Sequence, residues 1–252
     1  MRRLGGGARD RTLLRTLCGG IALLACVACL VPRSEAADSW GASLALTSDY
    51  LVRGISRTND HGALQLDVHY LNHTGFLAGV FASNTQFESG YPADVEFDAF
   101  VGFAWAAGGD WRSKLVANFY TYPWNPEGSK YNYVEADLDL IYRDWLDFTL
   151  VYSPDAPRYL AYEGLFGAAT ESAEVNLQRP VWGRLSGAAG IGYSHVNGPD
   201  ASGYTYWSVG AAYDLGPVSL AASYVDTTAA AKALYYNNAG GRHWVATLIW
   251  RF

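Results

Sequence analysis

The last nine residues of the chain alternate between large apolar side chains and smaller or more polar ones. Trp244, Ala246, Leu248, Trp250 and Phe252 fall on one face of an extended segment, because successive side chains of a β-strand point to opposite faces. A face with two Trp and one Phe needs an apolar environment. Two environments stay open at this point: the core of a soluble β-sandwich, or the hydrocarbon of a membrane.

The first 36 residues have the order of a secretory signal peptide. Five arginines between positions 2 and 15 precede an uncharged run over 16–31, and small residues follow before Ala37. This order predicts cleavage after Ala36, with an exported domain over 37–252. Two alternatives remain. The run is slightly short for an uncleaved membrane anchor, which needs about 20 apolar residues, and the segment 23–26 loosely resembles a lipoprotein cleavage site.

Cysteine content and charge exclude several function classes. All three cysteines and the only methionine lie in the first 36 residues, so the exported part has no disulfide and no thiol chemistry. The chain has 18 basic and 24 acidic residues, of which the first 36 residues hold 6 and 2. The exported part therefore keeps 12 and 22, a net charge of about −10, which argues against nucleic acid as a partner.

Period-two alternation continues through the rest of the chain. After Ala37 no uncharged apolar run approaches the length of a membrane-spanning helix, so a membrane location requires a closed β-barrel. The clearest strand covers 94–105, with Val95, Val101 and Trp105 on its apolar face. We predict about twelve strands, within a range of 10–14: 40–52, 63–70, 76–83, 94–105, 111–122, 131–143, 146–153, 168–178, 184–195, 203–214, 217–227 and 242–252.

The connections between these strands alternate in length. Five short turns and six longer loops place both termini of the barrel chain on the short-turn side, which is typical of bacterial outer-membrane barrels. Trp105, Trp111, Trp145 and Trp182 lie in or beside short turns, where one aromatic girdle belongs. Twelve apolar faces without helical cover favour this architecture over a soluble sandwich. We predict an all-β, antiparallel transmembrane barrel in a Gram-negative outer membrane, reached through the periplasm.

Four short segments also carry a family resemblance. They are LTSDYLVRGIS (46–56), GVFASN (79–84), EFD (96–98) and YNYVE (131–135). Together they resemble the TorF family of proteobacterial porins over most of residues 40–252, although that family usually has Gln where this chain has Arg57. The resemblance implies an outer-membrane barrel of the porin type and defines no solute. Trp250 and Phe252 resemble the C-terminal signal that the outer-membrane assembly machinery reads, so we expect them to contact it.

The search for reactive chemistry is negative. His69 and His73 are four residues apart, a spacing that separates ligands by about 13 Å along a strand. The sequence contains no Gly-x-Ser-x-Gly elbow, and nothing pairs a serine with a histidine. We therefore predict no catalytic, cofactor-binding or metal site, and an outer-membrane enzyme is a third and weaker alternative.

Charged residues fall on the face of each strand opposite its apolar face. A cation on the lipid face at mid-membrane costs about 2–4 kcal/mol, so these charges belong in the lumen. Counting along neighbouring strands places Lys114 opposite Asp139. The candidate pore-lining residues are Asp49, Arg53, Asp67, Asp94, Glu96, Asp98, Arg112, Lys114, Glu135, Asp137, Asp139 and Arg143. Their mixed signs could form a salt-bridge ladder, a transverse field that sorts permeants, or both.

Two functional hypotheses follow from this lumen. Eight-stranded barrels are filled by side chains and barrels of sixteen or more strands are open, so a twelve-stranded lumen could be either. Because acids exceed bases, the first hypothesis is a narrow channel for small polar solutes that favours cations. The second is a non-conducting structural or interaction barrel. The loop 228–241 could fold inward as a constriction or project outward as a binding surface.

Overall fold

The structure, a computed structural model, describes residues 38–86, 94–124, 131–160, 164–198, 202–235 and 239–252. The predicted signal peptide, with its cysteines, lies outside these residues. Within the described ranges, no helix is both long enough and apolar enough to cross a membrane.

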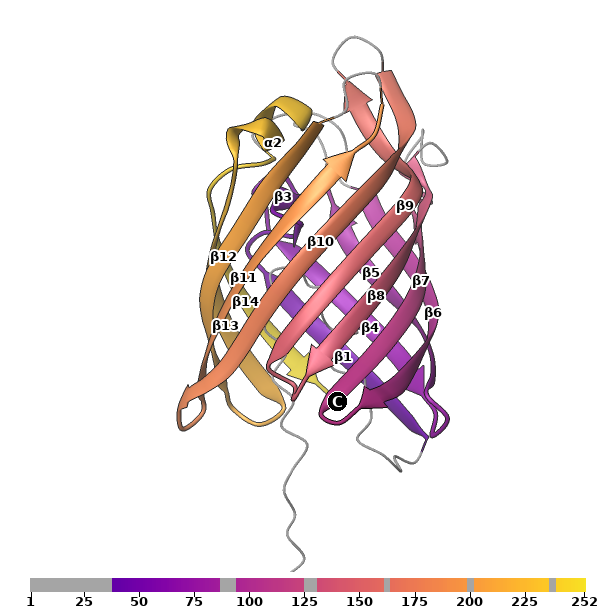
Figure 1. Cartoon of the computed structure of the whole chain (residues 1–252). Helices are drawn as coiled ribbons and strands as arrows, with labels where there is room; N and C mark the ends of the chain where they lie inside the picture. The colour runs from indigo at the N-terminus through magenta and orange to yellow at the C-terminus, as the bar shows by residue number, and fades with distance from the viewer. Residues whose placement is uncertain (1–37, 87–93, 125–130, 161–163, 199–201, 236–238) are drawn as a thin grey trace, which may run out of the picture.

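In this part of the chain, twelve antiparallel strands close into a barrel (Figure 1), which confirms the predicted fold class. Each strand pairs with the next along the chain, and β1 closes the barrel by pairing with both β4 and β14. The barrel strands are β1 (Ser39–Thr47), β4 (Ala63–Leu71), β5 (Phe76–Thr85), β6 (Asp94–Gly108), β7 (Trp111–Thr121), β8 (Tyr133–Tyr142), β9 (Leu146–Leu160), β10 (Gly164–Trp182), β11 (Leu185–Val196), β12 (Ser202–Asp214), β13 (Val218–Thr227) and β14 (His243–Arg251).

The two ends of the barrel differ as the connection lengths predict. Tight turns join the strands at the end where the C-terminus lies (Figure 1). At two of these turns the backbone is left-handed, with φ of 50° and 61° at Arg143 and Asp144, and 98° and 59° at Gly108 and Gly109. Positive φ at successive residues is what a tight hairpin requires.

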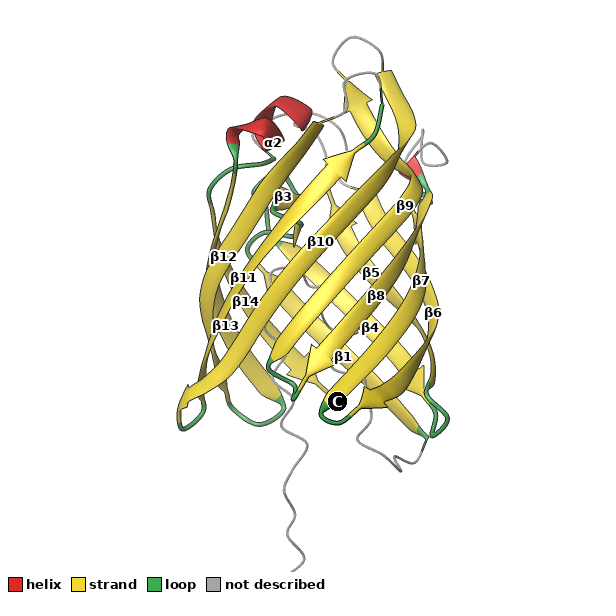
Figure 2. Ribbon diagram, in the orientation of Figure 1, coloured by secondary structure: helices red, strands yellow, loops and turns green. Residues whose placement is uncertain are grey.

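The opposite end departs from the sequence prediction in two places. β9 and β10 continue through most of the predicted loop 154–167 and form a hairpin that rises above the other strands (Figure 1). The predicted loop 228–241 contains a short helix, α2 (Ala229–Leu234), whose sequence AAAKAL is rich in helix-forming alanine (Figure 2).

The outer wall is apolar along every barrel strand. On β6, Val101 is 40% exposed whereas Asp98 is buried on the inner side. On β8, Leu138 is 41% exposed whereas the adjacent Asp139 is buried on the inner side. A continuous apolar exterior with a polar interior is the arrangement of a barrel that faces lipid. The face predicted from the C-terminal strand is confirmed, because Trp250 and Phe252 are exposed on the same exterior.

Aromatic side chains gather at both ends of this apolar exterior. Trp105 and Trp182 are exposed at the short-turn end. At the long-loop end, the rings of Trp207 and Tyr224 lie 5.5 Å apart, and those of Tyr224 and Trp244 lie 4.9 Å apart. Such belts match the two interfaces between lipid and water.

Candidate functional site

The segment that follows β1 folds into the barrel and forms the centre of the candidate site. β2 (Leu51–Val52) and β3 (Ile55–Ser56) make a small hairpin inside the barrel outline (Figure 2). We call residues 48–62 the inward segment. The sequence prediction of a strand over 40–52, with Tyr50 and Val52 facing lipid, is wrong in its last five residues: both side chains are buried inside the barrel.

Local hydrogen bonds explain why the chain turns inward after Thr47. The Oδ1 atom of Asp49 accepts hydrogen bonds from the hydroxyls of Ser56 and Thr58, at 2.6 and 2.9 Å. The backbone N–H of Tyr50 donates to the Thr58 hydroxyl at 3.0 Å. These contacts fold the segment back on itself, and alternation alone does not reveal them. Burial works against ionisation of Asp49, but its interactions with His243 and two hydroxyls outweigh that effect and hold its pKa below the ordinary value.

At the tip of the hairpin, Arg53 reaches across the lumen to β8. Its Nη1 and Nη2 atoms donate hydrogen bonds of 3.0 and 2.5 Å to the two carboxylate oxygens of Glu135. Arg53 has φ of 51° and Gly54 has φ of 76°, which is the tight geometry of the tip. A Cβ atom on Gly54 would lie 2.6 Å from Thr227, so the tip also packs closely against the far wall.

Tyrosine hydroxyls donate hydrogen bonds to two lumen carboxylates. Tyr50, from the inward segment, and Tyr122 both donate to Glu96, at 2.6 Å in the case of Tyr50. Across the lumen, Tyr206 donates to Glu174 at 2.6 Å. These charge-assisted hydrogen bonds keep the carboxylates in place without neutralising them.

One predicted ion pair of the lumen is confirmed. Lys114 pairs in register with Asp139, and its Nζ lies 3.0 Å from Oδ2 of that carboxylate. The Thr149 hydroxyl donates to the other oxygen at 2.7 Å. Lys114 is 3% exposed, so its ammonium group is shielded from water and faces the Asp139 carboxylate.

Acidic groups nevertheless remain in excess in the described lumen. Neither oxygen of Asp98 has a hydrogen-bond partner, and Oδ1 of Asp137 and of Asp147 also lack one. Two of the lumen cations are already paired, Lys114 with Asp139 and Arg53 with Glu135. Acidic side chains therefore outnumber cationic ones among the described lumen residues.

The structure places the predicted pore-lining residues as follows. Buried on the inner side are Asp49, Asp67, Asp94, Glu96, Asp98, Lys114, Glu135 and Asp139, and half-buried are Arg53, Arg112 and Asp137. Arg143 is an incorrect prediction, because β8 ends at Tyr142 and the Arg143 side chain lies in the turn, 58% exposed and hydrogen-bonded to Asp110. His69 and His73 do not meet. The Nδ1 atom of His69 is hydrogen-bonded to Asp67 at 2.5 Å, and the Nδ1 atom of His73 is hydrogen-bonded to Asp38.

Sequence reasoning missed four further lumen groups. Glu174 and Asp147 lie on the same faces of their strands as other polar residues, and this alternation could have identified them. Arg57, noted only as a departure from the TorF pattern, donates to the Tyr133 hydroxyl at 3.3 Å. Tyr50 had no such signal, because its burial depends on the turn after Thr47.

The lumen is filled unevenly. Between β4 and β8 an apolar cluster occupies the half nearer the short turns: Leu71, Leu77, Phe100, Ala104, Val116 and Ile141. The inner positions of β11–β13 carry small residues instead: Ser186, Ala188, Gly190, Ser208, Gly210, Ala212, Ser219 and Ala221. We call these inner positions the small-residue wall. The apolar cluster therefore has no counterpart at the small-residue wall among the described residues.

A cavity opens at the long-loop end above the hairpin. It offers about 50 Å³ to water-sized molecules, and its lining includes Arg53, Arg57, Tyr133, Tyr204 and Tyr235. The helix α2 packs on this end through Ala231 and Leu234, which share a buried cluster with Ile55 of the hairpin. The described part of the loop 228–241 therefore contacts the inward segment.

Solved structures with a similar fold include two porins. A structure titled "NanC porin structure in rhombohedral crystal form" superposes with a TM-score of 0.55 and 8% identity, over 84% of this chain and 98% of that one. A structure titled "KdgM porin" gives a TM-score of 0.52 and 10% identity, over 84% of this chain and 99% of that one. At these identities the likeness concerns the fold.

Comparison at the level of sequence identifies the family. No curated protein matches the chain. The model of a family described as "Bacterial protein of unknown function (Gcw_chp)" matches residues 34–251, which include all the barrel strands. This match does not confirm the TorF resemblance, which stays an expectation. The chain belongs to the Gcw_chp family of bacterial proteins.

Proposed function

We propose that the protein is an outer-membrane channel for small polar solutes that favours cations. The observation that carries the proposal is the surplus of unpaired carboxylate oxygens in the lumen, at Asp98, Asp137 and Asp147, beside cations that are already paired. An acidic constriction attracts cations and repels anions. Signal-peptide cleavage after residue 36 and passage through the periplasm complete the proposal.

The small-residue wall gives this channel its route. Ser208 and Ser219 line it with hydroxyls, and Gly190 and Gly210 add no side-chain volume. A solute that enters through the cavity beside Arg53 would have to pass the hairpin tip and would then continue along this wall. The porin folds of NanC and KdgM, and the TorF resemblance, support the same assignment.

A second candidate function is a non-conducting structural or interaction barrel. It is favoured by the apolar cluster around Leu77 and Phe100 at the short-turn half, together with the inward segment at the other half. If these two obstructions together closed the lumen, α2 and the β9–β10 hairpin would be the surfaces available to a partner.

Planar-bilayer recording of the purified, folded barrel separates the two functions. We expect single-channel currents whose reversal potential in a salt gradient indicates cation preference. A bulky side chain at Ser208 should abolish the current in Ser208→Trp. The matched control is Val209→Trp, because Val209 is 52% exposed on the lipid face of the same strand. Folded wild-type protein without any current would favour the non-conducting barrel.

A further inference from the structure

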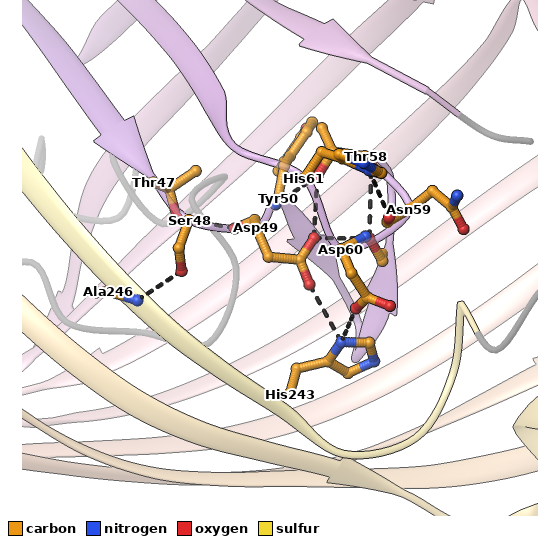
Figure 3. Close-up of polar contacts among 11 residues, drawn as sticks. Thr47, Ser48, Asp49, Tyr50, Thr58, Asn59, Asp60, His61, His243 and Ala246 are labelled. Carbon is orange, nitrogen blue, oxygen red and sulfur yellow. Dashed lines mark hydrogen bonds and ion pairs between the residues drawn. The ribbon is translucent and has the colours of Figure 1, made fainter. Parts of the chain in front are cut away.

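Three potential metal ligands meet where the inward segment touches β14. Figure 3 shows the carboxylates of Asp49 and Asp60 pointing at one ring nitrogen of His243, and the three ligand atoms lie within 4.8 Å of one another. The Nδ1 atom of His243 is 3.1 Å from Oδ2 of Asp49 and 2.8 Å from Oδ1 of Asp60. Neighbouring ligands of a tetrahedral ion with bonds of about 2.0–2.2 Å lie roughly 3.4 Å apart, so the three ligand atoms would need to separate by only about 0.3–0.6 Å to share an ion.

Hydrogen bonding within this group leaves one buried oxygen without a donor. Nδ1 of His243 carries at most one hydrogen, and its hydrogen bond is made with Asp60. The Oδ2 atom of Asp49 therefore accepts no hydrogen bond, although the residue is only 4% exposed. This buried oxygen has only an ion-pair contact with the ring nitrogen that is already shared with Asp60, at 3.1 Å, and a cation between the three ligand atoms would give it a full partner.

Neighbouring hydroxyls hold Asp49 in position, and the exposed Asp60 gives an ion access to the site from solvent. The other oxygen of Asp49 is held by the hydroxyls of Ser56 and Thr58, which turns Oδ2 toward His243. Contacts of this kind orient carboxylate ligands in metal sites. The side chain of Asp60 is 61% exposed, so an ion can reach the group from solvent.

We propose that Asp49, Asp60 and His243 bind a divalent transition-metal ion such as Zn²⁺, which fastens the inward segment to the barrel wall. One imidazole with two carboxylates suits Zn²⁺ and related ions, whereas Mg²⁺ and Ca²⁺ favour sites made of oxygen alone. Three protein ligands leave a position for water. The sequence did not suggest this site, because the barrel brings together residues 183 positions apart. The site does not depend on whether the lumen conducts.

Calorimetric titration of Zn²⁺ into the untagged, refolded barrel tests the proposal. We expect one ion per barrel and at least tenfold weaker binding in Asp60→Asn. Asp60 has φ of 62°, a conformation that Asn also tolerates, so this variant should fold. The matched control is His73→Gln, because His73 makes an exposed pair with Asp38, at 2.8 Å, that has no third ligand among the described residues.

A second measurement guards against misfolding of one variant. Zn²⁺ should raise the unfolding temperature of the wild type and of His73→Gln, and should leave that of Asp60→Asn and Asp49→Asn unchanged. The proposal is overturned if the wild type binds no Zn²⁺ saturably, or if Asp60→Asn binds it as tightly as the wild type. Loss of binding in His73→Gln instead would also overturn it.

Discussion

Arg53 and Glu135, which are 82 positions apart in the chain, are joined by two hydrogen bonds that span the lumen. The guanidinium and the carboxylate meet in the parallel, two-pronged geometry that gives such pairs their strength and direction. Glu135 is only 1% exposed and Arg53 is 12% exposed. The pair fixes the tip of the inward segment against β8, in the interior of the barrel.

Breaking this pair should loosen the constriction. In Arg53→Met the buried Glu135 loses its partner, which costs about 3–5 kcal/mol in typical buried pairs. We expect a lower urea midpoint for unfolding from liposomes and a larger or noisier single-channel current. Arg53→Lys keeps the charge without the two-pronged geometry and should fall between. An unchanged current in folded Arg53→Met would show that the tip does not limit the passage.

The assignment of the two barrel faces predicts a large difference between neighbouring positions. Val101 is lipid-facing, so Val101→Arg should destabilise the barrel by about 2–4 kcal/mol near the membrane midplane. Asp98→Asn, three residues earlier on the inner face, replaces a buried carboxyl group that has no hydrogen-bond partner by an uncharged amide of similar size and should cost much less. Urea titration in liposomes measures both. Equal losses in the two variants would contradict the assignment.

Ion selectivity should follow the balance of paired and unpaired charge. Asp137→Asn removes a lumen acid and should move the reversal potential in a salt gradient toward zero. Lys114→Gln releases Asp139 from its partner and should move it the other way. Because the Debye length is about 10 Å at 0.1 M salt, both shifts should grow as salt is lowered. A preference for anions in the wild type would mean that Arg53 and Arg57 dominate the field.

The C-terminal residue should matter for assembly. The backbone of Phe252 exchanges two hydrogen bonds with Ala42 of β1, at 3.0 and 3.2 Å, and its ring lies 5.3 Å from that of Trp250. Deleting Phe252 removes these closing contacts together with the expected signal for the assembly machinery. We expect less heat-modifiable barrel in outer membranes and normal export to the periplasm. Phe252→Tyr, which keeps an aromatic C-terminal residue, is the control and should assemble normally.

The sequence predicts the barrel well because the polarity of each wall residue indicates whether it faces lipid or lumen. A strand between lipid and lumen must alternate, so Val101 and Leu138 could be assigned to one face and Lys114 and Asp139 to the other without knowledge of their neighbours. The pairing of Lys114 with Asp139 then followed from counting outward from the 106–110 turn and inward from the 123–130 loop.

The inward segment could not be predicted in the same way. Tyr50 and Val52 continue the alternation of β1 although the strand has ended at Thr47. Their burial depends on contacts between side chains that are distant in the chain, such as Tyr50 with Glu96. Neither periodicity nor local propensity contains that information. The same reason hid the meeting of Asp49, Asp60 and His243.

The uneven filling of the lumen has a mechanical consequence. Side chains packed from Leu71 to Ile141 brace β4–β8 from within, so that half of the barrel should keep its curvature under lateral pressure from the bilayer. The small-residue wall, with Gly and Ala at its inner positions, has no such cluster among the described residues, because the cluster of Tyr204 and Tyr206 lies nearer the long loops. Lateral compression of the bilayer should therefore flatten the barrel cross-section on the side of β11–β13 only. A thicker or stiffer lipid mixture should change the width of the lumen without any change of sequence.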